Sequence, residues 1–536
     1  MTTEEIAKAI KLTAQLMELH NENPFKVRSL SNAAFKLDKT NVNLEGLSLE
    51  QLEKIEGIGK SIAQRIIELN EKGETGDLRA LLDKTPNGIL DMLRIKGIGP
   101  KKVGQLWKEL GIESVGELYY ACNENRLVAL KGFGEKTQAQ VKKAIEFRMA
   151  SEGKTHYAYA LLAAQEIITE MQKRAKPGDM ISFTGQIRRR CEIIEKIEIL
   201  VDEEAELDLT LFQNSFNIRQ EVIRVPKKDF AVKLFETTAT AGHLEKLSLT
   251  GTLKGNSEKE IYENLGMQYI APELREGLNE VDLARARKLP KLIEMSDLKG
   301  ILHNHTTYSD GINTLREMAE HCRKLGYQYL GVCDHSRSAF YANGLEPERI
   351  IAQQKEIDEL NKELAPFRIF KGIESDILYD GSLDYTDDVL ASFDLVVASV
   401  HSILKMDKEK ATARLIKAIE NPYTTILGHP TGRLLLSREG YPIDHKKVID
   451  ACAANGVIME LNAHPHRLDI DWKWIPYCLE RNVMVSINPD AHELEGYEDM
   501  FYGICVARKG MLTREMCFNA FTLDRMDDYL TSRKKK

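Results

Sequence analysis

The chain has 536 residues, which is too long for one hydrophobic core, so we expect two to four domains. The hydrophobic fraction of 43% is typical of a globular protein, and no stretch approaches the roughly 18 apolar residues of a membrane-spanning helix. A formal net charge of −8 neither requires nor excludes a nucleic-acid partner, because local basic clusters can differ from the mean. Eight single cysteines without a Cys-x-x-Cys pair, and an N-terminus without a signal-peptide pattern, favour a cytoplasmic protein with reduced thiols.

The first forty residues predict two helices. Residues 2–20 place Ala9, Leu12, Leu16 and Leu19 on one face at helical spacing. The sequence Asn-Glu-Asn-Pro-Phe interrupts this pattern, and a second helix is predicted over 27–37.

A motif of the form hydrophobe-x-Gly-hydrophobe-Gly then occurs three times, at 55–59, 95–99 and 130–134, and each copy opens an amphipathic helix. This is the helix-hairpin-helix signature. Its glycines let the backbone turn tightly and expose N–H groups at a helix N-terminus, which can hold a phosphate oxygen without reading base sequence. One such turn is most often a plain helix connection, but three copies favour DNA-backbone binding, to which nearby lysines add a salt-sensitive part. The residues expected to contact DNA are Gly57, Gly59, Lys60, Gly97, Gly99, Lys101, Gly132 and Gly134.

The pattern changes after residue 157. A long helix is predicted over 159–174, and strand-like runs follow it. One run begins with Gly185 and the pair Arg188-Arg189, and the next contains Lys196 and Glu198, whose side chains point to the same face of a strand.

Potential metal ligands end the strand-like runs of the C-terminal half. His303 and His305 follow a short apolar strand and point the same way, and Asp310 lies five residues on. Later runs end in His335, Glu374, His401, His429, Asp490 and His492. Helix-like segments such as 314–325, 348–364 and 444–455 separate these runs, which predicts a parallel sheet. Closed into a barrel, the sheet would bring all strand ends to one rim, where we expect a divalent-metal site.

Together these motifs resemble the bacterial family X DNA polymerases that carry a C-terminal PHP (polymerase and histidinol phosphatase) domain. Residues 185–198 are similar to the family's Gly-Ser-x-Arg-Arg and Asp-x-Asp palm motifs. Residues 257–276 are similar to its thumb, and 428–435 and 460–469 to its PHP motifs. The resemblance covers essentially the whole chain.

The palm departs from the family pattern at its metal site. Gln186 replaces the nucleotide-contacting serine, and the three aspartate positions hold Lys196, Glu198 and Glu221. A lysine offers no oxygen ligand and could pair with either glutamate, and magnesium tolerates distorted coordination poorly. We therefore expect a degenerate palm that keeps its fold without nucleotidyl transfer, formed by Gly185, Arg188, Arg189, Lys196, Glu198 and Glu221.

For the PHP half the resemblance implies two to three divalent ions, which could be manganese, zinc or iron. One ion would take His303, His305, Glu374 and Asp490; a second Glu374, His401 and His429; and a third Asp310, His335 and His492. Such ions activate water and stabilise charge on a phosphoryl oxygen, which implies phosphoester hydrolysis without a protein nucleophile. Arg433 and Arg467 follow strands at the same rim and are candidate phosphate contacts. The alternative is a structural ion pair with Asp469 or Glu460.

The expected organisation is an N-terminal α-helical helix-hairpin-helix region, an α+β nucleotidyltransferase-like palm with a thumb, and an α/β distorted (β/α)7 barrel. The predicted segments are a helical domain with a helix-hairpin-helix (1–85), a fingers-like helix-hairpin-helix region (86–150), the degenerate palm (151–250), a thumb-like region (251–288), a linker (289–300) and the PHP domain (301–536).

The leading functional hypothesis is a metal-dependent 3′–5′ exonuclease that processes DNA 3′ ends or abasic sites in repair. We expect a monomeric, nucleoid-associated cytoplasmic protein that acts on gapped, nicked or 3′-recessed DNA without sequence preference. Lys196 disfavours a working gap-filling polymerase with an accessory nuclease, and the three glycine turns disfavour a small-molecule phosphatase. The complete ligand set disfavours a purely DNA-binding protein.

Overall fold

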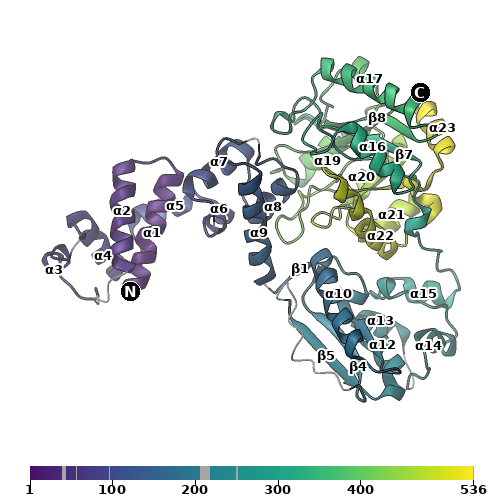
Figure 1. Ribbon diagram of the computed structural model, residues 1–536, viewed down its shortest axis with the longest axis horizontal. Helices are drawn as coiled ribbons and strands as arrows, with labels where there is room; N and C mark the ends of the chain where they lie inside the picture. Colours follow the sequence, from purple (N-terminus) through teal and green to yellow (C-terminus); the bar gives the residue numbers. More distant parts are fainter. Residues whose placement is uncertain are drawn as a thin grey trace. The chain divides into compact units, whose positions relative to one another are not determined.

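The computed structural model describes the chain except residues 39–43, 56, 96, 129, 152, 206–217, 249–251 and 535–536. Figure 1 shows its helices and strands in chain order. The chain forms two compact units: Met1–Cys122 with Lys131–Ile145, and Asn123–Leu130 with Glu146–Lys536. Among the described residues, no helix is long and apolar enough to cross a membrane.

The first unit is helical. Its first predicted helix is confirmed as α1, which Thr2 begins with a capping box. The second begins at Pro24, three residues before the expected start, because proline fits the first position of a helix. The helices that begin in this unit are α1 (Thr3–Leu19), α2 (Pro24–Asp38), α3 (Leu49–Glu53), α4 (Lys60–Lys72), α5 (Gly76–Asp83), α6 (Asn87–Met92), α7 (Pro100–Leu110), α8 (Val115–Asn123) and α9 (Glu135–Ser151).

The second unit begins with a small α+β region. Its main sheet has the order β2-β4-β5, with β2 antiparallel and β5 parallel to β4. Ala160, Ala163 and Ile167 of α10 share a core with Ile197 and Ile199 of β4. The elements are β1 (Thr155–His156), α10 (Tyr157–Arg174), β2 (Ile181–Thr184), α11 (Gly185–Arg188), β3 (Ile193–Ile194), β4 (Ile197–Asp202) and β5 (Gln220–Val225).

A helical region follows the sheet and has its own small core, which includes Phe235, Tyr262 and Ile270. Its helices are α12 (Phe230–Thr238), α13 (Ala241–Leu247), α14 (Glu258–Asn264) and α15 (Glu280–Arg285). This region leads into the barrel through a connection that contains a short 3-10 turn, Met295–Asp297, and ends where β6 begins at Gly300.

The C-terminal half is a parallel barrel in which each strand pairs with the next one in sequence, in the order β12-β11-β10-β9-β8-β7-β6. The two ends of this sheet meet, because the His305 N–H donates to the Ala491 carbonyl (2.8 Å) and the Asp490 N–H to the His303 carbonyl (3.1 Å). The predicted distorted (β/α)7 barrel is confirmed. The strands are β6 (Gly300–Ile301), β7 (Tyr329–Val332), β8 (Arg368–Asp376), β9 (Leu395–Ser399), β10 (Ile426–Leu427), β11 (Ile458–Asn462) and β12 (Val485–Asn488).

Helices surround these strands (Figure 1), and the three predicted ones match the observed bounds to within a residue. Thr314 and Asp444 cap the N-termini of two of them with side-chain hydrogen bonds. The helices are α16 (Leu315–Lys324), α17 (Pro347–Glu363), α18 (Asp387–Leu390), α19 (Lys408–Ile419), α20 (His445–Asn455), α21 (Ile475–Glu480), α22 (Met500–Lys509) and α23 (Leu523–Arg533).

The C-terminal segment closes one end of the barrel. Tyr329, the first residue of β7, donates its hydroxyl to the carbonyls of Asn519 and Phe521. Phe518 and Met526 pack into the same core as Leu302 and Tyr329. The strand starts are therefore covered, and the carboxyl ends of the strands carry the polar cluster described next.

Candidate metal centre and nucleic-acid interface

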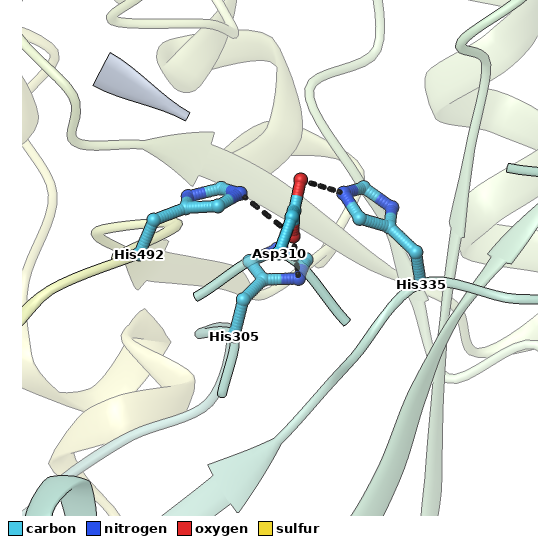
Figure 2. Close-up of side chains that lie close together, drawn as sticks. All are labelled: His305, Asp310, His335 and His492. Atoms are coloured by element: carbon cyan, nitrogen blue, oxygen red, sulfur yellow. Dashed lines mark ion pairs between the residues drawn. The ribbon is translucent and has the colours of Figure 1, made fainter. Parts of the chain in front are cut away.

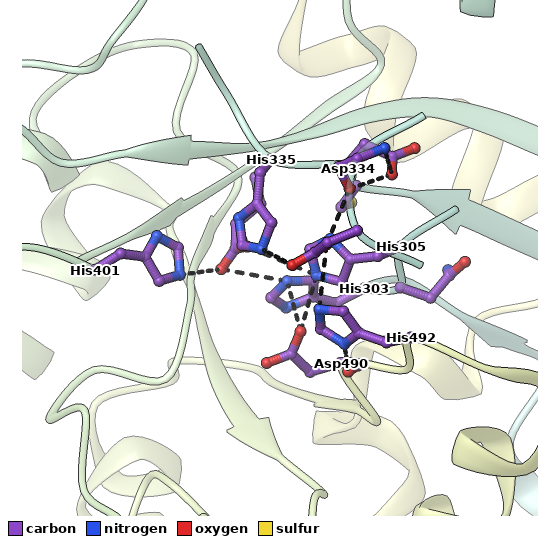
Figure 3. A network of polar contacts seen from close by, with 12 residues as sticks. His303, His305, Asp334, His335, His401, Asp490 and His492 are labelled. Atoms are coloured by element: carbon purple, nitrogen blue, oxygen red, sulfur yellow. Dashed lines mark hydrogen bonds and ion pairs between the residues drawn. The ribbon is translucent and has the colours of Figure 1, made fainter. Parts of the chain in front are cut away.

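The nine predicted ligand residues lie together at the carboxyl ends of the barrel strands, and Figure 3 labels six of them: His303, His305, His335, His401, Asp490 and His492. Glu374 of β8 connects most of them. Its Oε1 lies 3.0 Å from His429 Nε2 and 3.1 Å from His401 Nε2. Its Oε2 lies 2.9 Å from His335 Nδ1. One carboxylate thus faces three imidazoles from three different strands.

A second group surrounds Asp310 (Figure 2). The Asp310 carboxylate lies 3.4 Å from His492 Nε2, 3.6 Å from His335 Nε2 and 3.9 Å from His305 Nδ1. Each of these four residues has a ligand atom within 4.8 Å of the others. The separation suits one shared ion.

A third group contains the first histidine pair. His305 Nε2 lies 2.9 Å from Asp490 Oδ1, and His303 Nε2 lies 3.5 Å from the same oxygen. Glu374 Oε1 is 3.4 Å from His303 Nε2, so this group adjoins the one around Glu374. The alternation of side chains at the end of β6 brings both histidines to the rim, as the sequence predicts.

These residues fit divalent cations by the chemistry of their atoms. Buried polar atoms normally form hydrogen bonds, but several here lie close to one another without a hydrogen bond of good geometry among the described residues. They are His303 Nε2, His305 Nδ1, Asp310 Oδ2, His335 Nδ1, Glu374 Oε2, His429 Nδ1 and His492 Nε2. Imidazole nitrogens and carboxylate oxygens without thiolates suit zinc, manganese or iron.

The electrostatics keep the carboxylates ionised. Burial disfavours the charge of Glu374, but His401, His303 and His335 outweigh burial and hold the pKa of Glu374 well below its usual value. The pKa of Asp310 is likewise lowered against burial, by His335 and His492. Charged carboxylates are the form that binds a cation.

Three buried carboxylates that the sequence did not single out as functional hold the ligands in place. Glu460 Oε1 lies 2.7 Å from His303 Nδ1, and its Oε2 accepts the His429 backbone N–H at 2.6 Å. Asp376 Oδ1 lies 2.5 Å from His401 Nδ1. Such partners fix the orientation and tautomer of a ligating imidazole.

The third of these carboxylates, Asp334, orders the loop that carries Asp310. It accepts hydrogen bonds from the Thr306 N–H at 2.8 Å and from the Ser309 N–H at 3.1 Å (Figure 3). Asp334 directly precedes the ligand His335 in the sequence. Its position next to a predicted ligand is the feature of the sequence that could have indicated a supporting role for Asp334.

The two candidate phosphate contacts, Arg433 and Arg467, have different partners in the structure. Arg433 forms ion pairs with Glu192 (2.5 Å) and Asp471 (2.9 Å) and donates its Nε–H to the Arg467 carbonyl. Protein acceptors thus occupy the Arg433 guanidinium, and its contact with a phosphate stays a prediction. Its ion-pair partners also differ from the expected Asp469 and Glu460.

Arg467 is buried, with Nη2 3.9 Å from Glu124 Oε1. Asp469, expected as a partner for an arginine, instead accepts hydrogen bonds from the Thr431 N–H and hydroxyl.

The palm-like sheet carries an ion cluster at the three family aspartate positions. Lys196 Nζ lies 2.9 Å from Glu198 Oε1 and 2.7 Å from Glu221 Oε2. The parallel register of β4 and β5 places Glu198 opposite Glu221. Hydrogen bonds to both glutamates raise the pKa of Lys196. Gly185 has φ +60°, which glycine adopts without strain, and a Cβ there would lie 1.8 Å from Glu198 Oε2 and displace that carboxylate.

The arginine pair ties this sheet to the thumb-like helices. Arg188 forms a bidentate pair with Glu258 and also donates to the Thr238 hydroxyl at 2.7 Å. Arg189 Nε donates to Glu276 Oε1 at 3.2 Å. Both guanidinium groups are bound by protein acceptors.

The three glycine turns of the helix-hairpin-helix motifs share one backbone geometry. Gly57, Gly97 and Gly132 have φ of +90°, +102° and +88°, a region that glycine adopts without strain. Gly59 and Gly99 are the N-caps of α4 and α7 and provide no side-chain cap. The first N–H groups of those helices are thus left for an anion, and the exposed Lys60 and Lys101 lie in the same turns.

Gly134 directly precedes α9, so the third turn also leads into a helix. All eight residues expected to contact DNA therefore lie in turns, or in the first helical turns that follow them.

Comparison with known families and proteins agrees with this arrangement. Family models match a helix-hairpin-helix domain at 1–75, a SAM-like helix-hairpin-helix tandem at 89–146, a DNA polymerase beta thumb at 227–276 and a PHP domain at 302–464. The "DNA polymerase/3'-5' exonuclease PolX" of Bacillus subtilis (strain 168) is 34% identical over 99% of this chain and 99% of its own length. A probable phosphatase of Thermoanaerobacter sp. (strain X514) is 26% identical over 45% of this chain and 98% of its own. Another, from Acetivibrio thermocellus, is 31% identical over 30% of this chain and 64% of its own.

Proposed function

The chain belongs to the family X DNA polymerases of the PolX type that carry a PHP domain, and within that family we propose that it is a metal-dependent 3′–5′ exonuclease whose palm does not polymerise. The proposal makes the PHP half the hydrolytic part of the protein. In this proposal the N-terminal helix-hairpin-helix region holds the DNA.

The observation that carries the hydrolytic assignment is the cluster of nine histidine and carboxylate ligands at one rim. Bound divalent ions would supply Lewis-acid activation of water and stabilise negative charge on a phosphoryl oxygen. We assign His303, His305, Glu374 and Asp490 to one ion, Glu374, His401 and His429 to a second, and Asp310, His335 and His492 to a third. Glu460 and Asp376 would orient His303 and His401 toward those ions.

DNA is the proposed substrate because the chain has two separate helix-hairpin-helix matches and a polymerase thumb match. Glycine turns of this kind would contact phosphates without reading bases, so binding should not depend on sequence. We propose that the preferred DNA is gapped, nicked or 3′-recessed. Processing of 3′ ends or abasic sites in repair follows from such binding. We place the protein at the nucleoid in the cytoplasm, acting as a monomer.

The proposal that the palm is inactive rests on the position of Lys196. Two-metal nucleotidyl transfer needs oxygen ligands that hold both ions and align the attacking 3′ oxygen. Here an ammonium group pairs with the two glutamates that could supply those oxygens. Arg188 and Arg189 are also engaged by glutamates of the thumb-like region, which leaves the nucleotide's phosphates fewer free partners.

The second candidate is an active gap-filling polymerase with an accessory exonuclease. The name of the Bacillus subtilis relative includes both activities, which favours this candidate. The Lys196 ion cluster argues against it.

The test is degradation of a 5′-labelled single strand by wild-type protein and by the variant His303→Ala. We expect the variant to lose at least about 100-fold in rate, because it removes a ligand and the partner of Glu460. DNA affinity should change little, since the glycine turns are intact. The matched control is His321→Ala on α16, outside the ligand set. Equal rates for wild-type and His303→Ala protein would refute the assignment.

A further inference from the structure

The segment Asn123–Leu130 lies between the second and third helix-hairpin-helix turns in sequence but packs as part of the barrel's unit. Leu127 anchors it and is fully buried. Glu124 and Arg126 are largely buried too, with side chains 10% and 17% exposed. The segment thus brings two largely buried charges into the same unit as the proposed metal cluster.

Arg126 lies against the loop that follows a metal ligand. Its guanidinium carbon is 4.2 Å from the centroid of the Tyr341 ring, a cation–π contact. The Tyr341 ring is 6.4 Å from the ring of His335. Arg126 therefore borders the group of ligands around Asp310.

Arg126 also keeps hydrogen-bonding capacity that the protein does not use. Its Nη1 makes a long contact of 3.4 Å with Glu124 Oε2, and its buried Nε has no partner among the described residues. Arg433, on the same rim, shows the opposite pattern, since two carboxylates and backbone carbonyls bind its guanidinium. A largely buried arginine with an unused donor, held over an aromatic ring, is suited to bind phosphate oxygens.

We propose that Arg126 binds a backbone phosphate of the DNA strand whose 3′ end is hydrolysed at the metal cluster. The inference rests on the proposed exonuclease function and names one of its substrate-binding residues. A residue from between two helix-hairpin-helix turns would thereby complete the hydrolytic site. The contact is to a phosphate next to the one that is cleaved, so it favours a polynucleotide over a diester with a single phosphate.

The experiment compares two substrates on four proteins. The substrates are a 5′-labelled oligothymidylate and thymidine 5′-(p-nitrophenyl phosphate), which has a single phosphodiester. The proteins are wild type, Arg126→Ala, Arg126→Lys and the control Arg323→Ala, which removes an exposed arginine of α16. A phosphorothioate oligothymidylate that resists cleavage, used as an inhibitor of small-diester hydrolysis, measures binding separately from turnover.

For Arg126→Ala we expect kcat/KM on the oligonucleotide to fall about 10- to 100-fold, mainly through KM, as for a lost hydrogen bond to a charged group. The inhibition constant of the phosphorothioate oligonucleotide should rise by a similar factor. For the small diester, kcat/KM of Arg126→Ala should stay within about threefold of the wild-type value, because its single phosphate needs only the metal cluster. Arg126→Lys should recover part of the loss, since lysine keeps the charge without the fork. Arg323→Ala should match wild type.

Three outcomes would overturn the inference. Equal losses on both substrates would mean that Arg126 only supports the metal site. Unchanged or faster DNA cleavage by Arg126→Ala would mean that it makes no productive contact. Wild-type protein that cleaves the small diester but not DNA would refute the proposed function itself, and this inference with it. If Arg126→Ala fails to fold, Arg126→Gln, which keeps much of the stem over Tyr341, replaces it in the same comparison.

Discussion

Replacing Glu460 by glutamine tests whether a buried carboxylate outside the ligand set controls the metal centre. Each Glu460 oxygen accepts hydrogen bonds from nitrogen. Oε1 faces His303 Nδ1 (2.7 Å) and Asn488 Nδ2 (2.8 Å), and Oε2 faces the His429 N–H (2.6 Å). A glutamine keeps the shape but turns one of these acceptors into an NH2 donor. Whichever way the amide is oriented, two donors then face each other.

The size of the effect follows from those contacts. A buried donor without an acceptor costs about 1–3 kcal/mol, so Glu460→Gln should destabilise the barrel by about that amount. The loss of the carboxylate behind His303 should also weaken metal affinity about 10- to 100-fold. The two effects arise from the same hydrogen bonds and should appear together.

The assay is thermal unfolding of wild type, Glu460→Gln and the control Glu359→Gln, an exposed residue of α17, with and without added manganese. We expect Glu460→Gln to unfold at lower temperature without metal and to need about 10- to 100-fold more manganese for the same stabilisation. Glu359→Gln should behave as wild type. The reasoning fails if Glu460→Gln binds manganese with wild-type affinity.

Two further predictions concern other parts of the chain. The double variant Lys60→Ala with Lys101→Ala should make the plot of log binding constant against log salt concentration less steep, by up to about 1.8 in slope, or roughly 0.9 per lost phosphate contact. Fluorescence anisotropy at several salt concentrations measures this slope. An unchanged slope would mean that these lysines do not contact phosphates. Burial lowers the pKa of His156 to about 4 in the folded protein, whereas the pKa is near 6.5 in the unfolded chain. Between these two pH values the imidazole is protonated in the unfolded chain and neutral in the folded protein, which favours unfolding. Stability should therefore fall by up to about 3 kcal/mol as pH drops from about 6.5 towards 4, and His156→Gln should show a shallower loss in melting experiments.

The ligand cluster could be predicted from the sequence because a residue at the carboxyl end of any strand in a parallel barrel lies at the same rim. His303 and Glu374 end or follow apolar runs, and no knowledge of a partner is needed to place them. The supporting carboxylates are different. Glu460 lies within a strand, and only the closed barrel shows that it reaches His303 and His429. A glutamate inside the otherwise buried run of β11 was the signal available.

Contacts between segments distant in sequence could not be predicted for the same reason. Arg433 and its partner Glu192 are separated by 241 positions, and neither local pattern points to the other. The segment Asn123–Leu130 lies in a helical part of the chain, so its packing against the barrel follows from tertiary contacts alone. Local geometry was easier to predict, because the repeated glycines indicated tight turns, and glycine permits the positive φ found at Gly57, Gly97 and Gly132.

The most direct test of the account is one primer-extension gel with a 5′-labelled primer annealed to a longer template, in manganese, with and without deoxynucleotides. We expect wild-type protein to shorten the primer under both conditions. The variant Asp490→Ala, which removes a ligand carboxylate, should leave the primer unchanged under both, because neither hydrolysis nor extension remains. Lengthening of the primer by Asp490→Ala when nucleotides are present would show an active palm despite Lys196, and shortening by Asp490→Ala would show that hydrolysis does not depend on this metal cluster.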